Sequence, residues 1–336
     1  MKPYSSARDE FEDFDTADMI FLDANENPFQ NGVNRYPDPQ QASVKVVLGK
    51  MKNVSPKQIL LGNGSDEVLD LLFRAFCEPK FDSVITLPPT YGMYGVLANL
   101  NNVDNKEVLL TNDFQPQVEK ILETVTPTTK IIFLCSPNNP TGNSFSTESV
   151  TTLLEKFNGF VVIDEAYIDF SEQQSCTQWL SDFPNLVVTQ TFSKAWGLAA
   201  IRLGMAFAST EIIGLMNKVK PPYNVNELTQ RTALKALKNA EKTAVAIAEI
   251  LSEREKLADI LRGLDFVKKV HPSDANFLLV EVLQPNDLYN WLAINGVVVR
   301  NRNNVVLCEG CLRITVGTAA ENKALVKAMK EARMYA

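Results

Sequence analysis

Seven short apolar runs alternate with helix-like segments through the middle of the chain, and this alternation limits the possible folds most strongly. The runs are QILL (58–61), SVITL (83–87), EVLL (107–110), IIFL (131–134), FVVI (160–163), LVVT (186–189) and GMAFA (204–208). Helical patterns at 65–77, 90–100, 114–125 and 147–157 separate several of them. The alternation predicts an α/β domain with a largely parallel sheet, whose ligands gather where the strands end.

A second, smaller domain is predicted after Pro221 and Pro222, where the composition changes. Residues 226–264 are rich in Ala, Leu, Glu and Lys, and their length predicts two helices or one bent helix. Strand-like runs follow at 277–280, 297–300, 304–307 and 312–316, and then a helix from about Ala319. The predicted organisation is an extended arm over residues 1–40, a large α/β domain over 41–222 and a small α+β domain over 223–336.

Charge and cysteine usage exclude several classes of function. The chain of 336 residues has a net charge of −7 with mixed signs, so no basic stripe is available for nucleic acid. Its apolar runs are shorter than the roughly 18 residues that span a bilayer, and its polar N-terminus does not resemble a signal peptide. The odd count of 5 cysteines indicates reduced thiols and a cytoplasmic protein.

The single histidine limits the possible catalytic chemistry. Cys308 and Cys311 form a CxxC, but with no second pair, and with His271 as the only histidine, no zinc site is expected. We interpret the pair as structural. A serine or cysteine hydrolase would need His271 as its base, and no GxSxG motif accompanies it. Lysine is therefore the expected carrier of protons.

The segment TFSKAWGLAAIRLG (191–204) supplies a candidate lysine. Lys194 follows a strand end in a polar turn, where a neutral amine can form an imine with a carbonyl cofactor. Arg202 and the Ser193 hydroxyl are close enough in sequence to share a phosphate. Taken alone, Ser-Lys is a weak signal, and a solvated surface lysine is the simpler interpretation.

Two further motifs directly follow apolar runs. FVVIDEAYIDF places Asp164 where a carboxylate can keep a pyridine nitrogen protonated, with Tyr167 within reach of the ring hydroxyl. SPNNPTG (136–142) fixes the Asn139 amide in a turn, where it can bond a phenolate oxygen. A capping role for Asp164 and ordinary turn chemistry around Asn139 are the alternatives.

The loop LGNGSDE (61–67) leads from a strand into a helix. The backbone N–H groups of Gly64, Ser65 and Asp66 form a plausible phosphate cradle at that helix start. Glu67 stands where a dinucleotide fingerprint has its third glycine, which counts against an NAD-dependent oxidoreductase. Tyr91, after the next strand, is placed to stack on a planar ring, or else to lie in the core.

The four runs GNGSDE, SPNNPTG, DEAY and SKAxGLAxxRLG, in this order, resemble the fold type I pyridoxal-phosphate-dependent aminotransferases. The resemblance is closer to the histidinol-phosphate aminotransferase branch of this class II family. It extends there through LDANENPF (22–29), RYPDP (35–39), PPYNVN (221–226), ANF (275–277) and LRITVG (312–317). The similarity covers nearly the whole chain from Phe21 onward.

The resemblance implies a role for each matching residue. Lys194 would bind pyridoxal 5'-phosphate covalently and, with Asp164 and Tyr167, perform catalysis. The expected cofactor-binding residues are Lys194, Gly64, Ser65, Asp66, Tyr91, Asn139, Asp164, Tyr167, Ser193, Arg202 and Tyr36. Tyr36 would reach the cofactor of a neighbouring subunit, which implies a homodimer with shared active sites. Substrate would be held by Arg313, Arg300 and Asn25.

The implied reaction is amino transfer from L-histidinol phosphate to 2-oxoglutarate, giving imidazole acetol phosphate and L-glutamate in histidine biosynthesis. An aromatic amino-acid aminotransferase or a threonine-phosphate decarboxylase would share every cofactor residue. LDANENP and the ITVG after Arg313 favour histidinol phosphate over the decarboxylase. A non-catalytic regulator that senses the cofactor would need a DNA-binding module, and too few residues precede Asp23 to form one.

Overall fold

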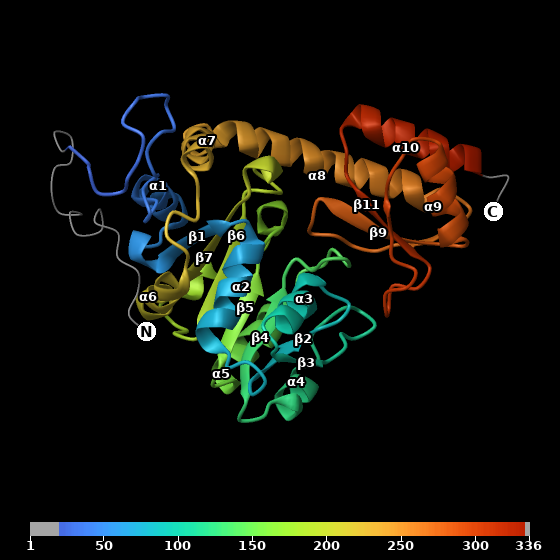
Figure 1. The fold of residues 1–336 in the computed structure, drawn as a ribbon. Helices are drawn as coiled ribbons and strands as arrows, with labels where there is room; N and C mark the ends of the chain where they lie inside the picture. Colours follow the sequence, from blue (N-terminus) through green and yellow to red (C-terminus); the bar gives the residue numbers. More distant parts are fainter. Residues whose placement is uncertain (1–19, 333–336) are drawn as a thin grey trace.

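The computed structural model describes residues 20–332, whose strands form two β-sheets (Figure 1). The larger sheet has seven strands in the order β1-β7-β6-β5-β4-β2-β3. Its strands are β1 (Ile59–Asn63), β2 (Ser83–Thr86), β3 (Asp104–Glu107), β4 (Thr129–Cys135), β5 (Phe160–Asp164), β6 (Leu186–Thr191) and β7 (Leu203–Ala208). Strand β7 is antiparallel to both neighbours, and the remaining pairs are parallel, which confirms the mostly parallel α/β sheet.

Helices cover both faces of this sheet, because its central strands are buried on both sides. One face packs against α2 (Ser65–Phe76), α3 (Met93–Leu100) and α6 (Thr210–Val219). The other face packs against α1 (Ala42–Lys52), α4 (Val118–Thr124) and α5 (Thr147–Lys156). The parallel register aligns Cys135, Asp164 and Thr189 across β4, β5 and β6, so these strands end at one edge.

The smaller sheet is antiparallel throughout and lies beside the larger one (Figure 1). Its order is β10 (Arg300–Asn301), β11 (Cys311–Thr315), β9 (Phe277–Val282) and β8 (Val267–Val270). Helices α9 (Pro285–Ile294) and α10 (Ala319–Glu331) share its hydrophobic core with the C-terminal half of α8 (Ala240–Arg262). This arrangement is the α+β architecture predicted for the C-terminal part of the chain.

The helical stretch expected over residues 226–264 consists of two helices, α7 (Glu227–Leu237) and α8. The Asn226 side chain accepts a hydrogen bond from the backbone N–H of Thr229 and so caps the start of α7. Figure 1 shows α8 running from α7, beside the larger sheet, to the smaller sheet. The helix therefore links the two sheets along one side of the molecule.

Three predicted strands differ from the structure. The run 107–110 is displaced, because β3 pairs through Asp104–Glu107 and the buried Val108 and Leu110 follow it. The run 304–307 forms turns, since Leu307 has a positive φ of 61° that a strand does not tolerate. Of the run 297–300, Arg300 alone enters a strand, the two-residue β10.

Among the α-helices and strands of residues 20–332, four were not predicted, namely α1 (Ala42–Lys52), α6 (Thr210–Val219), α9 (Pro285–Ile294) and β8 (Val267–Val270). Strand β8 carries the exposed Lys268 and Lys269 at the edge of its sheet, so it has no apolar run to reveal it. Residues 20–40 form no helix or strand, as an extended arm would, whereas residues 1–19 of that arm lie outside the described residues. We retain the boundaries after residues 40 and 222 as a proposal; the second falls between α6 and α7.

Candidate active site

A cavity of about 560 Å³ lies where β4, β5 and β6 end. It gathers residues from both sheets, which are far apart in the sequence. The predicted site residues that line it are Ser65, Asp66, Tyr91, Asn139, Asp164, Tyr167, Ser193, Lys194, Arg202, Arg300 and Arg313. Parallel strand ends therefore converge on a ligand-sized cavity, as expected for this class of sheet.

Asp164 is the last residue of β5, and its side chain is buried. Its Oδ2 accepts a hydrogen bond of 2.8 Å from the Tyr94 hydroxyl, and its Oδ1 accepts one of 3.1 Å from Thr189. Burial raises the pKa of Asp164, while these hydrogen bonds act in the opposite direction. Among residues 20–332 no cation pairs with this carboxylate. A protonated ring nitrogen would supply the missing partner.

Lys194 follows β6 in a turn closed by a hydrogen bond from the Gly197 N–H to the Lys194 carbonyl. Its Nζ lies 5.5 Å from the centroid of the Tyr167 ring. The pKa of Lys194 is lowered, first because the amine loses solvent and then because the Arg313 charge repels it. The charge of Asp164 opposes this shift. A lysine with a reachable neutral form is suited to attack a carbonyl carbon.

Asn139 forms hydrogen bonds with both Tyr167 and Arg313, which line the same cavity. Its Nδ2 donates to the Tyr167 hydroxyl oxygen at 3.4 Å, and its Oδ1 accepts a hydrogen bond from Nη1 of Arg313. The Arg313 guanidinium lies over the Phe277 ring, with Cζ 5.2 Å from the centroid. Nε of Arg313 is buried and has no partner within the described part of the chain. A bound anion would satisfy this donor.

The start of α2 brings a second set of groups that suit an anion to the cavity. Gly64 has φ +80°, a backbone conformation that residues with a side chain rarely adopt, and the space where a Cβ would lie is 2.7 Å from Nη2 of Arg202. Nη1 of Arg202 donates to Ser193 Oγ at 3.4 Å, and its Nη2 lies 3.7 Å from Asp66 Oδ2. Backbone N–H groups at a helix start, a guanidinium and a hydroxyl together suit a phosphate.

Tyr91 lines the same cavity. Its hydroxyl donates a hydrogen bond of 3.0 Å to Asp66 Oδ1. Its ring packs edge-on against the Tyr94 ring, with centroids 5.6 Å apart. The hydroxyl is thus tied to the start of α2, and the ring forms part of the cavity wall, where a planar ligand can stack on it.

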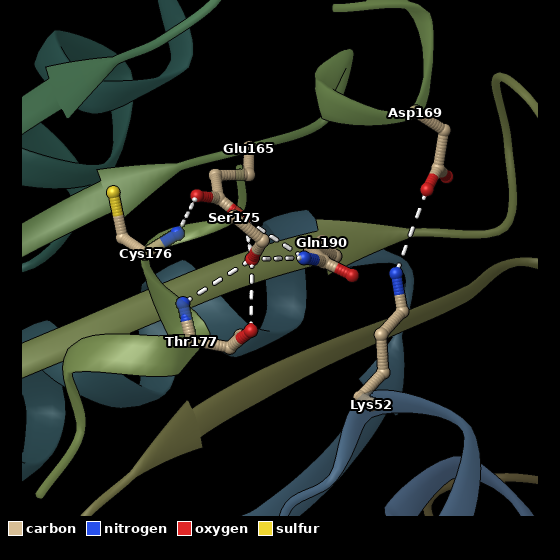
Figure 2. Close-up of polar contacts among 7 residues, drawn as sticks. All are labelled: Lys52, Glu165, Asp169, Ser175, Cys176, Thr177 and Gln190. Carbon is tan, nitrogen blue, oxygen red and sulfur yellow. Dashed lines mark hydrogen bonds and ion pairs between the residues drawn. The ribbon is translucent and has the colours of Figure 1, made fainter. Parts of the chain in front are cut away.

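Glu165 faces a different, smaller cavity of about 280 Å³ and not the one that Asp164 borders. Figure 2 shows its carboxylate accepting hydrogen bonds from the Cys176 N–H at 2.7 Å, the Ser175 hydroxyl at 2.6 Å and the Gln190 amide at 2.8 Å. The same view shows Lys52 pairing with Asp169 at 3.5 Å. These contacts fix the segment after β5, which carries Tyr167, to β6 and α1.

Two predicted residues lie away from the main cavity. Asn25 and Tyr36 line a separate cavity of about 450 Å³ beside the start of α7. The Tyr36 ring stacks on Tyr223 with centroids 4.6 Å apart, and its backbone N–H donates to Glu26. Glu26 also pairs with Arg35 at 2.8 Å. The structure therefore places these arm residues together, but not with Lys194 in the same chain.

The sequence did not reveal several residues of the site. Tyr94 and Thr189 hold Asp164, while Thr90, Cys135 and Arg302 line the cavity. Tyr94 lies one helical turn after Tyr91, and this spacing in PPTYGMY could have placed both on one side of a helix. Arg302 could have been found from its alternation with Arg300 along a strand.

Within residues 20–332, neither the CxxC pair nor a metal-binding cluster provides a second reactive centre. Cys308 and Cys311 are buried free thiols, and burial raises the pKa of each to about 12, which disfavours the reactive thiolate. Across residues 20–332 no group of three or more His, Cys, Asp or Glu side chains is arranged to hold a metal ion. The described helices include none long and apolar enough to cross a membrane.

The fold and the cavity together define a class of protein. The family model of class I and II aminotransferases matches residues 13–329, and the chain belongs to this family. Among solved structures, the histidinol-phosphate aminotransferase of Clostridium acetobutylicum is similar with a TM-score of 0.84 and 22% identity, covering 90% of this chain and 92% of that one. The fold is thus that of the fold type I enzymes.

Relatives with higher sequence identity to this chain are named histidinol-phosphate aminotransferase. A histidinol-phosphate aminotransferase of Flavobacterium johnsoniae is 65% identical over 98% of this chain and 95% of its own length. That of Christiangramia forsetii is 61% identical over 98% of this chain and 94% of its own length. The Sinorhizobium meliloti enzyme of that name, solved in complex with pyridoxal-5'-phosphate, has a TM-score of 0.83 and 23% identity over 90% of this chain and 84% of that one.

Proposed function

We propose that this chain transfers the amino group of L-histidinol phosphate to 2-oxoglutarate, in histidine biosynthesis, with pyridoxal 5'-phosphate bound at Lys194. One observation carries the proposal. A single cavity joins a lysine of lowered pKa and a buried carboxylate to the Arg313 guanidinium, whose buried Nε lacks a partner among the described residues. Full-length relatives named histidinol-phosphate aminotransferase support this choice of donor.

The residues of the cavity fit this cofactor. Asp164 would pair with the ring nitrogen, Asn139 and Tyr167 would bond the ring hydroxyl, and Tyr91 would cover the ring. The phosphate group would be held by Ser193, Arg202 and the N–H groups of Gly64, Ser65 and Asp66. Bound pyridoxal phosphate supplies an electron-withdrawing ring that takes up the electron pair left when the substrate Cα loses its proton.

The chain itself positions the reactants and moves the proton. Arg313 binds the anionic group of the donor, which directs the donor Cα toward Lys194. The Lys194 amine, in its neutral form, removes the proton from that Cα. After donor and acceptor exchange, the same amine returns a proton to Cα of the former oxo acid. The Asp164 carboxylate, which accepts a hydrogen bond from Tyr94, would pair with the ring nitrogen and stabilise positive charge there.

We propose a homodimer in which Tyr36 and Asn25 complete the active site of the neighbouring subunit. Exposed apolar side chains of the arm support this proposal, because a surface of this kind is normally covered. They include Ile20, Leu22, Phe29 and Val33, each more than half exposed. We further propose a cytoplasmic location, since all 5 cysteines are free thiols.

A single-turnover spectrum tests the proposed reaction. Protein loaded with pyridoxal phosphate is mixed separately with L-histidinol phosphate, phenylalanine and threonine phosphate, and the cofactor absorbance is followed. The blank is Lys194→Ala, and the control is Lys120→Ala, which removes an exposed lysine on α4. We expect L-histidinol phosphate to change the spectrum fastest, and 2-oxoglutarate to restore it.

Each alternative gives a distinct result. A faster reaction with phenylalanine would leave the proposed cofactor site in place but would reject L-histidinol phosphate as the donor. Release of carbon dioxide from threonine phosphate would indicate a decarboxylase. A wild-type protein that binds pyridoxal phosphate without any borohydride-trapped link to Lys194 would reject the catalytic role of this lysine. A bound cofactor with no turnover of any amino donor would support a regulator.

A further inference from the structure

Three arginines lie on one face of the short ribbon formed by β10 and β11. Arg300 is directly opposite Arg313 in the antiparallel register. Side chains two residues apart on a strand point to the same side, so Arg302 follows Arg300 onto this face. The backbone N–H of Arg302 donates to the Cys311 carbonyl at 2.9 Å and extends the pairing by one residue. All three side chains line the cavity that contains Lys194.

Within residues 20–332, no carboxylate forms an ion pair with any of these three arginines. Burial and repulsion from Arg300 lower the pKa of Arg302. Like charges opposite each other in a ribbon are destabilising. An anion with more than one negative charge would remove this repulsion.

We propose that Arg302 determines specificity by recognising the second negative charge of the donor's phosphate group, an inference that rests on the proposed function. Arg313 can bind either a carboxylate or a phosphate, because its guanidinium suits both. Glutamate and 2-oxoglutarate carry their two carboxylates on separate carbons, so the carboxylate that Arg313 binds brings one negative charge to the cluster, whereas a phosphate monoester brings about 1.5 to 2 at pH 7. Arg302 therefore stabilises the phosphorylated donor selectively and contributes little to binding of the oxo acid or glutamate.

The test compares Arg302→Gln and Arg302→Lys with the wild-type holoenzyme. Each half-reaction is measured separately in single turnover, with L-histidinol phosphate or with L-glutamate as the amino donor. Arg262→Gln, which removes a half-exposed arginine of α8 outside the cavity, is the matched control. For Arg302→Gln we expect the dissociation constant of L-histidinol phosphate to rise roughly 10- to 100-fold, the usual range for a lost charged hydrogen bond. The dissociation constant of glutamate should not change. Arg302→Lys should restore part of the lost affinity for L-histidinol phosphate.

A pH series separates charge recognition from a structural effect. The second ionisation of a phosphate monoester has a pKa of about 6, so the donor loses a charge below this pH. The dissociation constant of L-histidinol phosphate should differ most between wild type and Arg302→Gln above pH 7, and this difference should shrink below pH 6. If the ratio of the two dissociation constants, Arg302→Gln over wild type, does not change with pH, the proposal is overturned. Equal losses for L-histidinol phosphate and glutamate would overturn it as well.

Inorganic phosphate makes the test independent of the donor's identity. Its inhibition constant against the glutamate half-reaction is measured for wild type and Arg302→Gln. A weaker inhibition of the variant supports the role of Arg302, and identical inhibition rejects it. If the wild type fails to use L-histidinol phosphate, the proposed function falls, while the phosphate measurement still decides whether Arg302 recognises the dianion.

Discussion

The Tyr94 hydroxyl donates a hydrogen bond of 2.8 Å to Oδ2 of Asp164, and both side chains are buried. The Tyr94 ring is itself held in place, because it stacks on Phe133 with centroids 5.0 Å apart. Together with Thr189, it fixes the carboxylate at the end of β5 and favours its charged form against the effect of burial. Tyr94 thus acts on the proposed chemistry through Asp164.

Tyr94→Phe removes this hydrogen bond and leaves the ring packing intact. We expect the pKa of Asp164 to rise further, because a bond that favours the carboxylate is lost. The affinity for pyridoxal phosphate should fall roughly 10- to 100-fold, as for the loss of one hydrogen bond to a charged group. Fluorescence titration and the pH profile of the half-reaction measure the effect. Tyr289→Phe on α9 is the control, and an unchanged pH profile in Tyr94→Phe would contradict the role of Tyr94.

The charges around Lys194 predict how its pKa responds to substitution. Its folded-state pKa lies below the ordinary 10.5, so the neutral amine persists at a lower pH than in the unfolded chain. Arg313→Met should raise this pKa, since a repelling charge is removed. Asp66→Asn should lower it, since Asp66 stabilises the charged amine. The rate of reductive methylation at Lys194 in the cofactor-free protein, followed against pH by mass spectrometry, tests both directions. Shifts of the same sign would contradict the electrostatic explanation.

Much of the site could be predicted because its residues follow apolar strands. Asp164 ends β5 directly, and Asn139 and Lys194 stand in the turns after β4 and β6. In a parallel sheet such positions meet at one edge, so local patterns were enough to bring the three side chains together. Arg313 was placed by resemblance alone, because its distance from Lys194 depends on how the two sheets pack.

The residues that were missed depend on long-range packing. Tyr94 reaches Asp164 across 70 residues of sequence, because α3 packs against the larger sheet. Arg302 joins the cavity only through the register that sets Arg300 opposite Arg313 in a two-residue strand. Apolar content around 304–307 suggested a strand there, but the hairpin between β10 and β11 requires turns. Local spacing in the sequence could have singled out Tyr94 and Arg302 as candidates, but it does not show which distant residues they meet.

Glu165→Gln should destabilise the fold more than it affects substrate binding. The Glu165 carboxylate accepts hydrogen bonds from Ser175, the Cys176 N–H and Gln190, and a glutamine would turn an NH₂ group toward these donors. We expect a loss of about 1–3 kcal/mol in the free energy of unfolding, the cost of leaving buried groups unsatisfied. Urea unfolding measures it. Glu155→Gln, at an exposed position of α5, is the control, and equal stabilities for the two variants would argue against this network.

Gly204→Ala and Gly214→Ala should have opposite effects on stability. A Cβ at Gly204, on β7, would lie 2.2 Å from the Ser65 backbone nitrogen and 2.4 Å from the Gly64 carbonyl carbon. The start of α2 would have to move, which disturbs the proposed phosphate cradle and costs about 1–3 kcal/mol of stability, as overpacking does. Gly214, inside α6, has open space around its Cβ position, so alanine there should stabilise by about 0.5–1 kcal/mol through its helix propensity.

Urea unfolding and titration with pyridoxal phosphate test this pair together. Gly204→Ala should both unfold at lower urea and bind the cofactor more weakly, because the backbone that it displaces carries the N–H groups of Ser65 and Asp66. Gly214→Ala should unfold at higher urea and bind the cofactor as the wild type does, since α6 lies outside the cavity. Should Gly204→Ala lose stability but keep full cofactor affinity, the start of α2 would not be the phosphate site, and Ser193 with Arg202 would have to hold that group alone.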